Sequence, residues 1–398
     1  MAQPPRDELL HRVTQTAGRF RALDACRGFC AVLVVLFHLP AATHFHDWPI
    51  IRNGYVAVDF FFVLSGFVIA SAYGDRIATA SQAARFAVRR FGRLYPLHLA
   101  VVAVYVGVEF ANLADEAPAF EGAFSLAALG QHVALVQGFT AQALTWNYPA
   151  WSISIELWVN LAFGAYVLIL GRRAIWASLA LVLFTVVFYL SAKALALPVT
   201  AATLVQWTVV AQSVFGFVLG TLVYQVYVKT RLHSWRPGLL AEALAVVAII
   251  LIFAERAHFH ALLSPLMFAC VVWVLAYDAG PVSAFFHRRP WQALGAVSYS
   301  VYLTHALYLM AFDQIVNALA DHLGRPASAV VGAQDLLILG GPWVMDMAGL
   351  ACVAGVIAGS LLTYRFIEEP ARQVFNRLSG PLVPPTSTLA SIARWPQA

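Results

Sequence analysis

Long apolar runs alternate with short polar segments along almost the whole chain. Ten of these runs have about the 20 residues that an α-helix needs to cross a bilayer. The pattern predicts spanning helices over residues 24–44, 55–73, 94–111, 148–170, 174–195, 204–228, 238–254, 262–277, 291–312 and 343–364. A further segment, 124–139, is short and holds Gln131, His132 and Gln137, so we expect it to lie at the interface or to re-enter without spanning.

The composition points to the same fold class. Hydrophobic residues make up 61% of the 398 residues and charged residues only 11%, against about 25% in typical soluble proteins. So few charges could not cover the surface of a soluble domain of this size. We therefore predict an all-α, polytopic membrane helix bundle of about ten transmembrane helices. The four cysteines lie in apolar segments without metal-ligand spacing, so we expect no metal site.

The basic residues predict the orientation of the bundle. With the ten spans in place, 21 of the 25 Lys and Arg residues lie at the cytoplasmic side, which holds both termini, and four lie on the other side. We expect a multi-pass protein of the bacterial inner membrane, in contact with membrane lipid. The net charge of +5 is thus a topology signal, and we expect no nucleic-acid partner. The chain divides into a cytoplasmic segment 1–22, a membrane domain 23–378 and a disordered cytoplasmic tail 379–398.

Two polar residues bracket the first apolar run, in the stretch RGFCAVLVVLFH. Arg27 and His38 are eleven residues apart, or about three helical turns, so they share one helix face and lie roughly 16 Å apart along it. An arginine at the centre of a membrane helix costs roughly 2.5–3.5 kcal/mol on insertion scales. The alternative to a functional site is a snorkelling arginine and a packed histidine. We place Arg27 near the cytoplasmic surface and His38 in the outer third of the membrane.

Three other predicted spans carry a titratable residue. Asp59 lies one turn inside the second span, Glu156 lies in the fourth and His305 in the ninth. With a rise of about 1.5 Å per residue, all three come to the depth of His38. Intramembrane ionisable groups usually face a bundle interior or a wet cavity, so we expect these four residues to meet in one polar site. Polar residues nearby on the same helices are Ser65, Ser152, Ser298 and Tyr302.

A cluster of arginines precedes the third predicted span, in the stretch ARFAVRRFGRLYPLHL. Its members are Arg85, Arg89, Arg90 and Arg93. One interpretation is cytoplasmic anchoring with contacts to lipid headgroups. The other is a bidentate clamp for the phosphates of a nucleotide-like cytosolic ligand, which Arg27 could join because it lies at the same depth.

Six stretches in chain order carry a resemblance to a known family: RALDACRGFCAVLVVLFH, GYVAVDFFFVLSGFVIA, RRFGRLYPLHL, WSISIEL, SYSVYLTHAL and FIEEPAR. Together, over nearly the whole chain, they resemble the membrane-bound acyltransferase 3 family. Members of that family O-acylate polysaccharides, lipopolysaccharide O-antigens, glucans, nodulation factors and macrolides. One departure is the start of the first stretch, where Ala25 and Cys26 stand in place of a common Gly-Leu pair, and we expect only repacking from it.

The resemblance implies roles for particular residues. An arginine and a histidine eleven residues apart match Arg27 and His38, with the histidine as catalytic base. Paired arginines before the third span match Arg90 and Arg93. The resemblance also implies cytosolic acyl-CoA, most often acetyl-CoA, as donor substrate, with no bound cofactor, and a hydroxyl of a carbohydrate or other outer-side molecule as acceptor. A Trp-Ser-x-x-x-Glu motif matches Trp151, Ser152 and Glu156.

These observations combine into one expected mechanism. The donor binds at Arg27, Arg90, Arg93 and Ser65, and its pantetheine arm reaches upward to His38. There the histidine deprotonates the acceptor hydroxyl, with Asp59 or Glu156 orienting the imidazole. An acyl-histidine intermediate is the alternative chemistry, and His305 could compete for the role of base. The expected wall of the site is formed by Ser152, Tyr299, Tyr302 and His305.

Two other function classes fit part of the pattern. A proton-coupled transporter or permease also places Asp, Glu and His inside the membrane, as proton relays. It has no need of the arginine cluster at one mouth of the bundle, which favours the acyltransferase. A non-catalytic partner or sensor in polysaccharide export would tolerate the loss of His38, whereas an enzyme would not. Glu368 or Glu369 of the FIEEPAR stretch is expected to form a structural ion pair with a nearby arginine.

Overall fold

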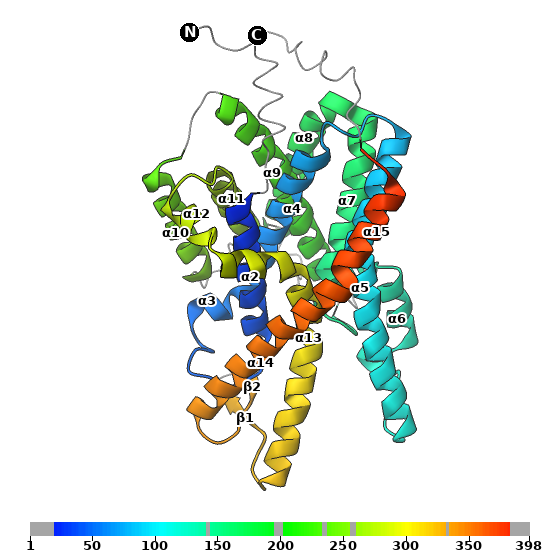
Figure 1. The fold of residues 1–398 in the computed structure, drawn as a ribbon, viewed down its shortest axis with the longest axis vertical. Helices are drawn as coiled ribbons and strands as arrows, with labels where there is room; N and C mark the ends of the chain where they lie inside the picture. The colour runs from blue at the N-terminus through cyan, green and yellow to red at the C-terminus, as the bar shows by residue number, and fades with distance from the viewer. Residues whose placement is uncertain are drawn as a thin grey trace.

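The computed structural model describes residues 20–140, 144–194, 202–232, 237–254, 260–331 and 334–382, and these form a helix bundle (Figure 1). Each of the ten predicted spans corresponds to a helix. The ten are α2 (Arg21–His38), α4 (Ala57–Tyr73), α5 (Ala80–Ala114), α7 (Ala150–Leu170), α8 (Ala174–Ala194), α9 (Ala202–Leu232), α10 (Leu239–Ala254), α11 (His260–Leu275), α13 (Arg289–His322) and α14 (Pro342–Thr363).

Shorter elements connect these helices. They are α3 (Pro49–Arg52), η1 (Gly54–Val56), η2 (Gly122–Phe124), α6 (Leu126–Val133), η3 (Gln137–Phe139), η4 (Gly171–Arg173), α12 (Pro281–Phe286), β1 (Ser328–Val331), β2 (Gln334–Leu337), η5 (Tyr364–Glu368) and α15 (Glu369–Ser379). The eight residues of α6 are far too few to cross a bilayer, so segment 124–139 is confirmed as non-spanning. The terminal segments of the prediction lie outside the described residues, except for 20–22 and 379–382.

Within the described residues, five helical stretches are long and apolar enough to cross a membrane. They are Gly54–Tyr73, Ala80–Ala114, Ala150–Leu170, Gln206–Arg231 and Pro342–Ser379. Three shorter apolar helices accompany them, at Ala174–Phe188, Leu239–Ala254 and Leu262–Leu275. The chain is therefore an all-α integral membrane protein, while the count of ten spans stays a prediction.

The first helix is shorter than its apolar run suggested. The predicted span extends to residue 44, but α2 ends at His38 and Leu39 is extended, with φ −65° and ψ 112°. Pro40 follows, and a residue before proline is disfavoured in the helical region, which explains the stop. Beyond it the chain runs beside the hairpin β1–β2, where Ala41 pairs with Leu337. His38 thus stands at the end of its helix, next to a loop.

Glycines allow two pairs of helices to approach closely. A side chain at Gly28 of α2 would clash with the backbone of Gly295 in α13. A side chain at Gly66 of α4 would clash with the Phe217 carbonyl of α9. In lipid there is no hydrophobic driving force between helices, so their association depends on close van der Waals packing. Small residues such as glycine permit that packing because they let two backbones approach. The two contacts fix α2 against α13 and α4 against α9, which sets the positions of the polar residues on those helices.

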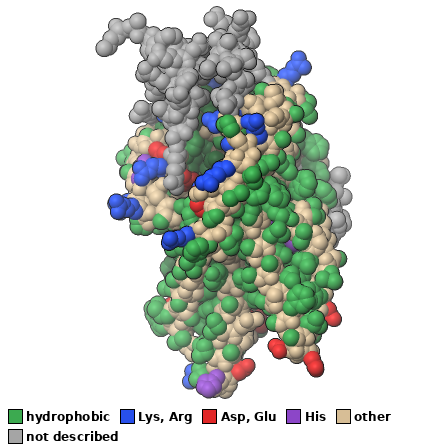
Figure 2. All heavy atoms as spheres, turned by 45° about the vertical axis from the view of Figure 1, so that its right-hand side comes forward, with side chains coloured by type: hydrophobic (Ala, Val, Ile, Leu, Met, Phe, Trp, Pro, Cys, Tyr) green, Lys and Arg blue, Asp and Glu red, His purple; other side chains and the backbone are tan. Residues whose placement is uncertain are grey.

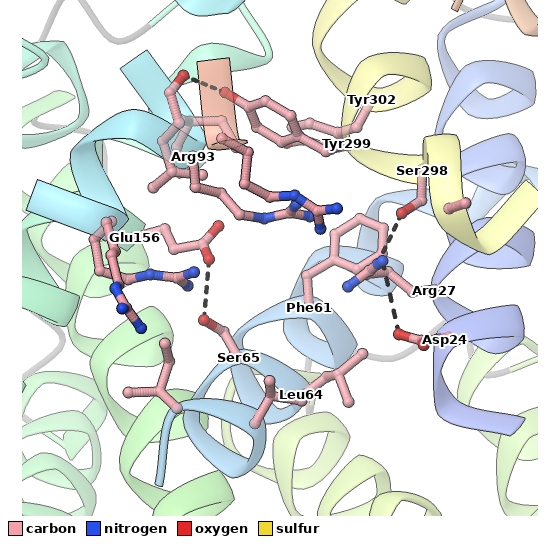
Figure 3. A pocket seen from close by; sticks show the side chains of 18 of the residues that line it. Asp24, Arg27, Phe61, Leu64, Ser65, Arg93, Glu156, Ser298, Tyr299 and Tyr302 are labelled. Carbon is pink, nitrogen blue, oxygen red and sulfur yellow. Dashed lines mark hydrogen bonds and ion pairs between the residues drawn. The ribbon is translucent and has the colours of Figure 1, made fainter. Parts of the chain in front are cut away.

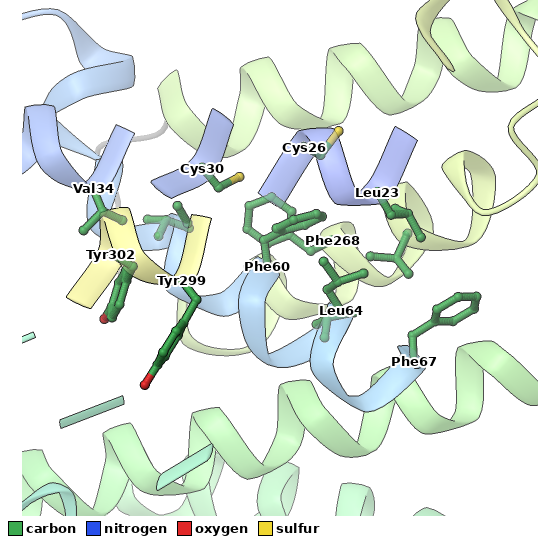
Figure 4. Packing of buried hydrophobic residues seen from close by; sticks show 14 of the residues in the cluster. Leu23, Cys26, Cys30, Val34, Phe60, Leu64, Phe67, Phe268, Tyr299 and Tyr302 are labelled. Carbon is green, nitrogen blue, oxygen red and sulfur yellow. The ribbon is translucent and has the colours of Figure 1, made fainter. Parts of the chain in front are cut away.

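The largest apolar cluster lies between α2, α4, α9 and α11 (Figure 4). Phe60 and Phe67 of α4 are buried in it, and Phe60 makes an edge-to-face contact with Phe268 of α11 at 5.6 Å. At its edge lie Tyr299 and Tyr302 of α13, whose phenol groups point away from α2 in Figure 4. The apolar core therefore carries the side chains of the polar site on its margin.

The surface is polarised along the bundle. Figure 2 shows most of the visible Lys and Arg side chains toward the upper end and several Asp and Glu side chains at the lower end, with a broad hydrophobic region between. Helix α15 packs on α5, where Phe375 fills the space over Gly92. This brings a C-terminal helix across the arginine-rich part of α5, as Figure 1 also shows.

Candidate active site

A cavity of about 680 Å³ opens between α2, α4, α5, α7, α13 and α15. Five arginines line it: Arg27 from α2, Arg89, Arg90 and Arg93 from α5, and Arg372 from α15. Arg27 and Arg93 point into the same space in Figure 3. Cavities of 300–1,000 Å³ are typical of small-molecule sites. The structure thus brings the expected donor-binding arginines together from two helices far apart in the sequence.

Arg27 is held in place by the opposite helix. Its Nε donates to Ser298 Oγ at 2.7 Å and its Nη2 donates to the Gly295 carbonyl at 2.9 Å, both on α13. Asp24, one turn earlier on α2, lies 3.7 Å from Nη2 (Figure 3). These contacts fix the guanidinium in the cavity wall, so Arg27 is pre-positioned and does not merely extend toward the membrane surface.

Arg93 is held by a buried carboxylate. Its Nη1 lies 3.2 Å from Glu368 Oε1, and Ser300 Oγ donates to Glu368 Oε2 at 2.7 Å. Glu368 is only 2% exposed and comes from η5, the single π-helical turn that joins α14 to α15. The expected ion pair of the FIEEPAR stretch therefore exists, and it holds one of the cavity arginines.

Arg90 forms no comparable ion pair with any of the residues that the structure describes. Its buried Nε makes no hydrogen bond within the described residues, and its guanidinium lies 5.9 Å from the ring centre of Tyr73. Leaving a buried donor without an acceptor costs about 1–3 kcal/mol of folding free energy. The cost is larger when the donor is charged. An anionic group in the cavity would supply the missing acceptor.

The other two arginines of the cluster do something different. Arg89 Nε donates to Ser379 Oγ at 2.8 Å, and Arg85 Nη1 donates to the Pro381 carbonyl at 2.6 Å. Arg89 Nη2 also donates to the Gly380 carbonyl at 2.6 Å. Basic side chains at the C-terminal end of a helix satisfy its free carbonyl groups. Arg85 and Arg89 therefore attach α15 to α5. Arg85 lies outside the cavity, whereas Arg89 lines it together with Arg90 and Arg93.

Glu156 and Ser65 meet in the same cavity. Ser65 Oγ of α4 donates to Glu156 Oε1 of α7 at 3.0 Å (Figure 3). The carboxylate also interacts electrostatically with Arg27, Arg90 and Arg93. Glu156 thus balances part of the positive charge of the cavity, and it lies with the arginines.

Tyr302 and Ser152 contact each other in the wall of the cavity. The Tyr302 hydroxyl lies 2.7 Å from Ser152 Oγ and donates to the Pro149 carbonyl at 3.1 Å. Tyr299, one turn earlier on α13, donates to the Leu94 carbonyl, and its ring lies 5.9 Å from the Arg93 guanidinium carbon. Both tyrosines and Ser152 line the cavity, whereas His305, the fourth residue of the predicted wall, does not.

His38 and His305 lie beyond this wall and contact each other. His305 Nε2 is 3.3 Å from His38 Nδ1, and the two rings are 5.1 Å apart. His305 is completely buried, whereas His38 is partly accessible and packs against the ring of Tyr148 at 5.0 Å. Neither histidine lines the arginine cavity itself. The link between the two regions is Tyr302, whose carbonyl accepts a hydrogen bond from His305 Nδ1 at 2.6 Å.

Asp59 lies apart from both the arginine cavity and the histidine pair. Gln212 Nε2 of α9 donates to both of its carboxylate oxygens, at 2.9 and 3.0 Å, and Ser264 Oγ of α11 donates at 2.5 Å. Its neighbours Phe61 and Phe62 line the cavity, but Asp59 does not. Its carboxylate is instead enclosed by polar side chains of α9 and α11.

The expectation of one convergent site is therefore wrong. His38 and His305 are together, Glu156 lies with the arginines, and Asp59 is enclosed by α9 and α11. Equal depth in the membrane did not determine contact, because each residue also has a direction around its helix axis. The expectation that Asp59 or Glu156 orients His38 is corrected for the same reason, since both carboxylates have other partners.

Sequence reasoning missed the partners that these residues find. Tyr148 was placed inside the fourth span, but it precedes α7 in a turn and packs on His38. Gln212 and Ser264 carried no motif. Their only signal was a polar side chain within an apolar helix, which does not say which residue it meets.

Comparison with known proteins identifies related chains. The family model for an acyltransferase domain matches residues 20–365. A protein named membrane-bound transacylase BcsY, from Komagataeibacter xylinus, is 28% identical over 320 residues, which cover 74% of this chain and 76% of that protein. Acyltransferase MdmB from Streptomyces mycarofaciens is 25% identical over 385 residues, 90% of this chain and 93% of its own.

A third relative covers less of the chain. Protein 2 in the picA locus of Rhizobium radiobacter is 34% identical over 183 residues, which cover 42% of this chain and 89% of that protein. No solved structure matches. The site described above lies within the residues that the family model covers, apart from Glu368 of η5 and the helix α15.

Proposed function

This chain belongs to the acyltransferase 3 family, and from that premise we propose that it moves an acetyl group from cytosolic acetyl-CoA to a hydroxyl of a glycan or similar acceptor on the outer side of the membrane. Membership of the family makes it an O-acyltransferase. The donor, the acceptor class, the inner-membrane location and the residue roles below are the proposal. The transporter alternative is not favoured, because the matching family and two relatives are acyltransferases.

The arginine cavity is the observation that carries the proposal. Coenzyme A presents several phosphate groups, and arginine binds phosphate through paired, charge-assisted hydrogen bonds. Arg27 and Arg93 are fixed by hydrogen bonds and an ion pair, while the buried Arg90 Nε lacks an acceptor. A phosphate between them would satisfy Arg90 without rearranging the other two. This preorganisation supports a polyanionic donor better than a lipid headgroup at an open surface.

The direction of transfer follows from the positions of the two polar regions. Arg27 lies in the first half of α2 and Arg90 and Arg93 in the first half of α5. Both helices begin toward the upper end of the bundle in Figure 1, which is also the end where most of the basic side chains visible in Figure 2 gather. The positive-inside rule assigns that end to the cytoplasm. His38 lies at the other end of α2, where the chain leaves the helix next to the β1–β2 hairpin. A donor with its phosphates at Arg27 therefore directs its thioester toward Tyr302 and the histidine pair.

The chemistry assigned to His38 is general base catalysis. As the acceptor oxygen attacks the thioester carbonyl carbon, its proton passes to His38 and a C–O bond forms. Collapse of the tetrahedral intermediate breaks the C–S bond, and the leaving thiolate takes the proton back from His38 as coenzyme A thiol. Positioned base catalysis contributes typically about 10²–10⁴-fold.

The direct test uses membranes that contain the full chain. Membranes with the wild-type protein should release free coenzyme A thiol from acetyl-CoA in the presence of host surface glycan, and membranes from a deletion strain should not. Mass spectrometry of the glycans should show an acetyl mass that the deletion strain lacks. If wild-type membranes neither consume acetyl-CoA nor change the glycan mass, the proposed donor and acceptor are wrong.

A rapid-quench experiment separates direct transfer from an acyl-histidine intermediate. With isotopically labelled acetyl-CoA and no acceptor, direct transfer leaves no label on the protein. Covalent label that appears with donor alone, and that the acceptor then removes, would instead establish a two-step reaction.

A further inference from the structure

The hydrogen bonds of the histidine pair determine where its protons lie. His38 Nδ1 is 2.9 Å from the Val34 carbonyl oxygen. A carbonyl oxygen only accepts hydrogen bonds, so His38 Nδ1 carries a hydrogen. In the neutral imidazole the other nitrogen, Nε2, then has a free lone pair. That is the nitrogen a general base needs.

The same logic applies to His305. Its Nδ1 is 2.6 Å from the Tyr302 carbonyl oxygen and therefore also carries a hydrogen. The Nε2 of a neutral His305 is then an acceptor, and it lies 3.3 Å from His38 Nδ1. The His38 Nδ1 hydrogen is shared between two acceptors, the Val34 carbonyl and His305. The contacts form one consistent chain from His38 through His305 to the Tyr302 carbonyl.

No acid supports this base. In serine hydrolases a carboxylate orients the imidazole and stabilises its charged form. Here Asp59 bonds to Gln212 and Ser264, and Glu156 bonds to Ser65. Among the residues that the structure describes, no carboxylate forms a hydrogen bond or ion pair with either imidazole.

We propose that His305 is the positioning residue of the base: a neutral imidazole that occupies the place of a carboxylate and holds His38 with its Nε2 free. The inference rests on the proposed function, in which His38 is the base. When His38 takes the acceptor proton, its Nδ1–H group becomes a stronger donor, and the Nε2 lone pair of His305 stabilises the cation. The proton returns to the leaving thiolate, so His305 ends each turnover unchanged.

The geometry also assigns His305 a role distinct from that of a second base. Its Nε2 lone pair faces His38, its Nδ1 hydrogen is donated to Tyr302, and it is completely buried on α13. Neither nitrogen is open to an acceptor hydroxyl. His38, by contrast, is partly accessible at the end of α2.

The test compares two substitutions at one position in the purified full chain. Glutamine in His305→Gln can place an amide oxygen near the position of Nε2, whereas leucine in His305→Leu fills the space without an acceptor. We expect His305→Leu to lower kcat about 100-fold, the scale of a misplaced catalytic group, and His305→Gln to restore at least a tenth of the wild-type value. KM and Kd for acetyl-CoA should not change in either variant. His322→Leu, the same substitution at the exposed end of α13, should leave all three values unchanged.

Two results would overturn the inference while leaving the proposed function intact. Wild-type kcat in His305→Leu would remove His305 from the mechanism. A glutamine variant as inactive as the leucine variant, with donor binding preserved, would mean that His305 itself transfers a proton.

A second measurement does not depend on turnover. Nitrogen-15 NMR of protein labelled at its twelve histidines should show His38 protonated at Nδ1 and bare at Nε2. His38→Gln identifies the signal. A proton on Nε2 in the neutral state contradicts the arrangement, whether or not acetyl-CoA is the donor.

Discussion

The arginine cavity and the histidine pair are both polar regions in the membrane domain, but they leave opposite groups unsatisfied. In the cavity, the unpaired group is a cationic donor, Arg90 Nε. At the histidine pair, the hydrogen bonds leave a lone pair free on His38 Nε2. A site with a spare donor binds an anion, and a site with a spare lone pair accepts a proton. The difference assigns binding to one region and chemistry to the other.

Removing the free lone pair of His38 Nε2 should have the largest effect on turnover. We expect His38→Ala to lower kcat by about 10²–10⁴-fold, because positioned base catalysis is lost. Donor affinity, measured as Kd for acetyl-CoA, should stay at the wild-type value, since the arginines are untouched. Transfer at a near wild-type rate in a correctly folded variant would exclude His38 as the base.

Breaking the ion pair between Arg93 and Glu368 should have the next largest effect, and this effect is on stability. Glu368→Gln leaves the mostly buried Arg93 without its carboxylate, and breaking a buried pair costs about 3–5 kcal/mol. We expect a clearly lower Tm in detergent and weaker acetyl-CoA binding. Glu369→Gln is the matched control: its pair with Arg372 is more exposed, where such pairs contribute about 0–1 kcal/mol. Equal Tm losses in the two variants would contradict the structural role of Glu368.

Substituting Arg90 tests the role of its buried Nε donor in the cavity. Arg90→Ala should raise KM and Kd for acetyl-CoA about 10–100-fold, the loss of a hydrogen bond to a charged group, with kcat little changed at saturating donor. Arg85→Ala is the control on the same helix, because Arg85 bonds to the Pro381 carbonyl instead of lining the cavity. If both variants bind acetyl-CoA as tightly as wild type, the cavity is not the phosphate site.

Substituting Asp59 should have the smallest effect on the reaction as a whole, counting both donor binding and turnover. Because it is enclosed by Gln212 and Ser264, away from both regions, Asp59→Asn should keep kcat within about 10-fold of wild type and change mainly the Tm, since hydrogen bonds to a charged group contribute about 1.5–3 kcal/mol. A loss of kcat as large as that of His38→Ala, at unchanged Tm, would return Asp59 to the catalytic group.

Much of the site could be predicted because its signals are local. The eleven-residue spacing of Arg27 and His38 fixes a common helix face and a distance along one axis, whatever surrounds the helix. The arginine cluster and the Ser152–Glu156 spacing are likewise properties of single helices. The structure places Arg27, Arg90, Arg93, Ser65 and Glu156 around one cavity.

The assignment of partners could not be predicted in the same way. The four arginines before the third span look alike in sequence, yet Arg85 and Arg89 bond to residues at the end of α15, while Arg93 pairs with Glu368. Of the four, Arg85 is the one that does not line the cavity. A carboxylate within an apolar run indicates that the side chain has a polar partner in the folded protein, but it does not indicate which residue that partner is. Asp59 found an amide and a hydroxyl instead of an imidazole.

Composition and the period of single helices were enough to predict where the long apolar helices lie, the asymmetry of the basic residues and the family. The folded arrangement was needed to show that His305 meets His38, that Glu156 lies with the arginines and that, within the described residues, Arg90 Nε has no hydrogen-bond acceptor. Those contacts depend on how each helix is rotated about its axis and how closely it packs. Residues such as Gly28 and Gly66 set that packing by allowing two backbones to touch.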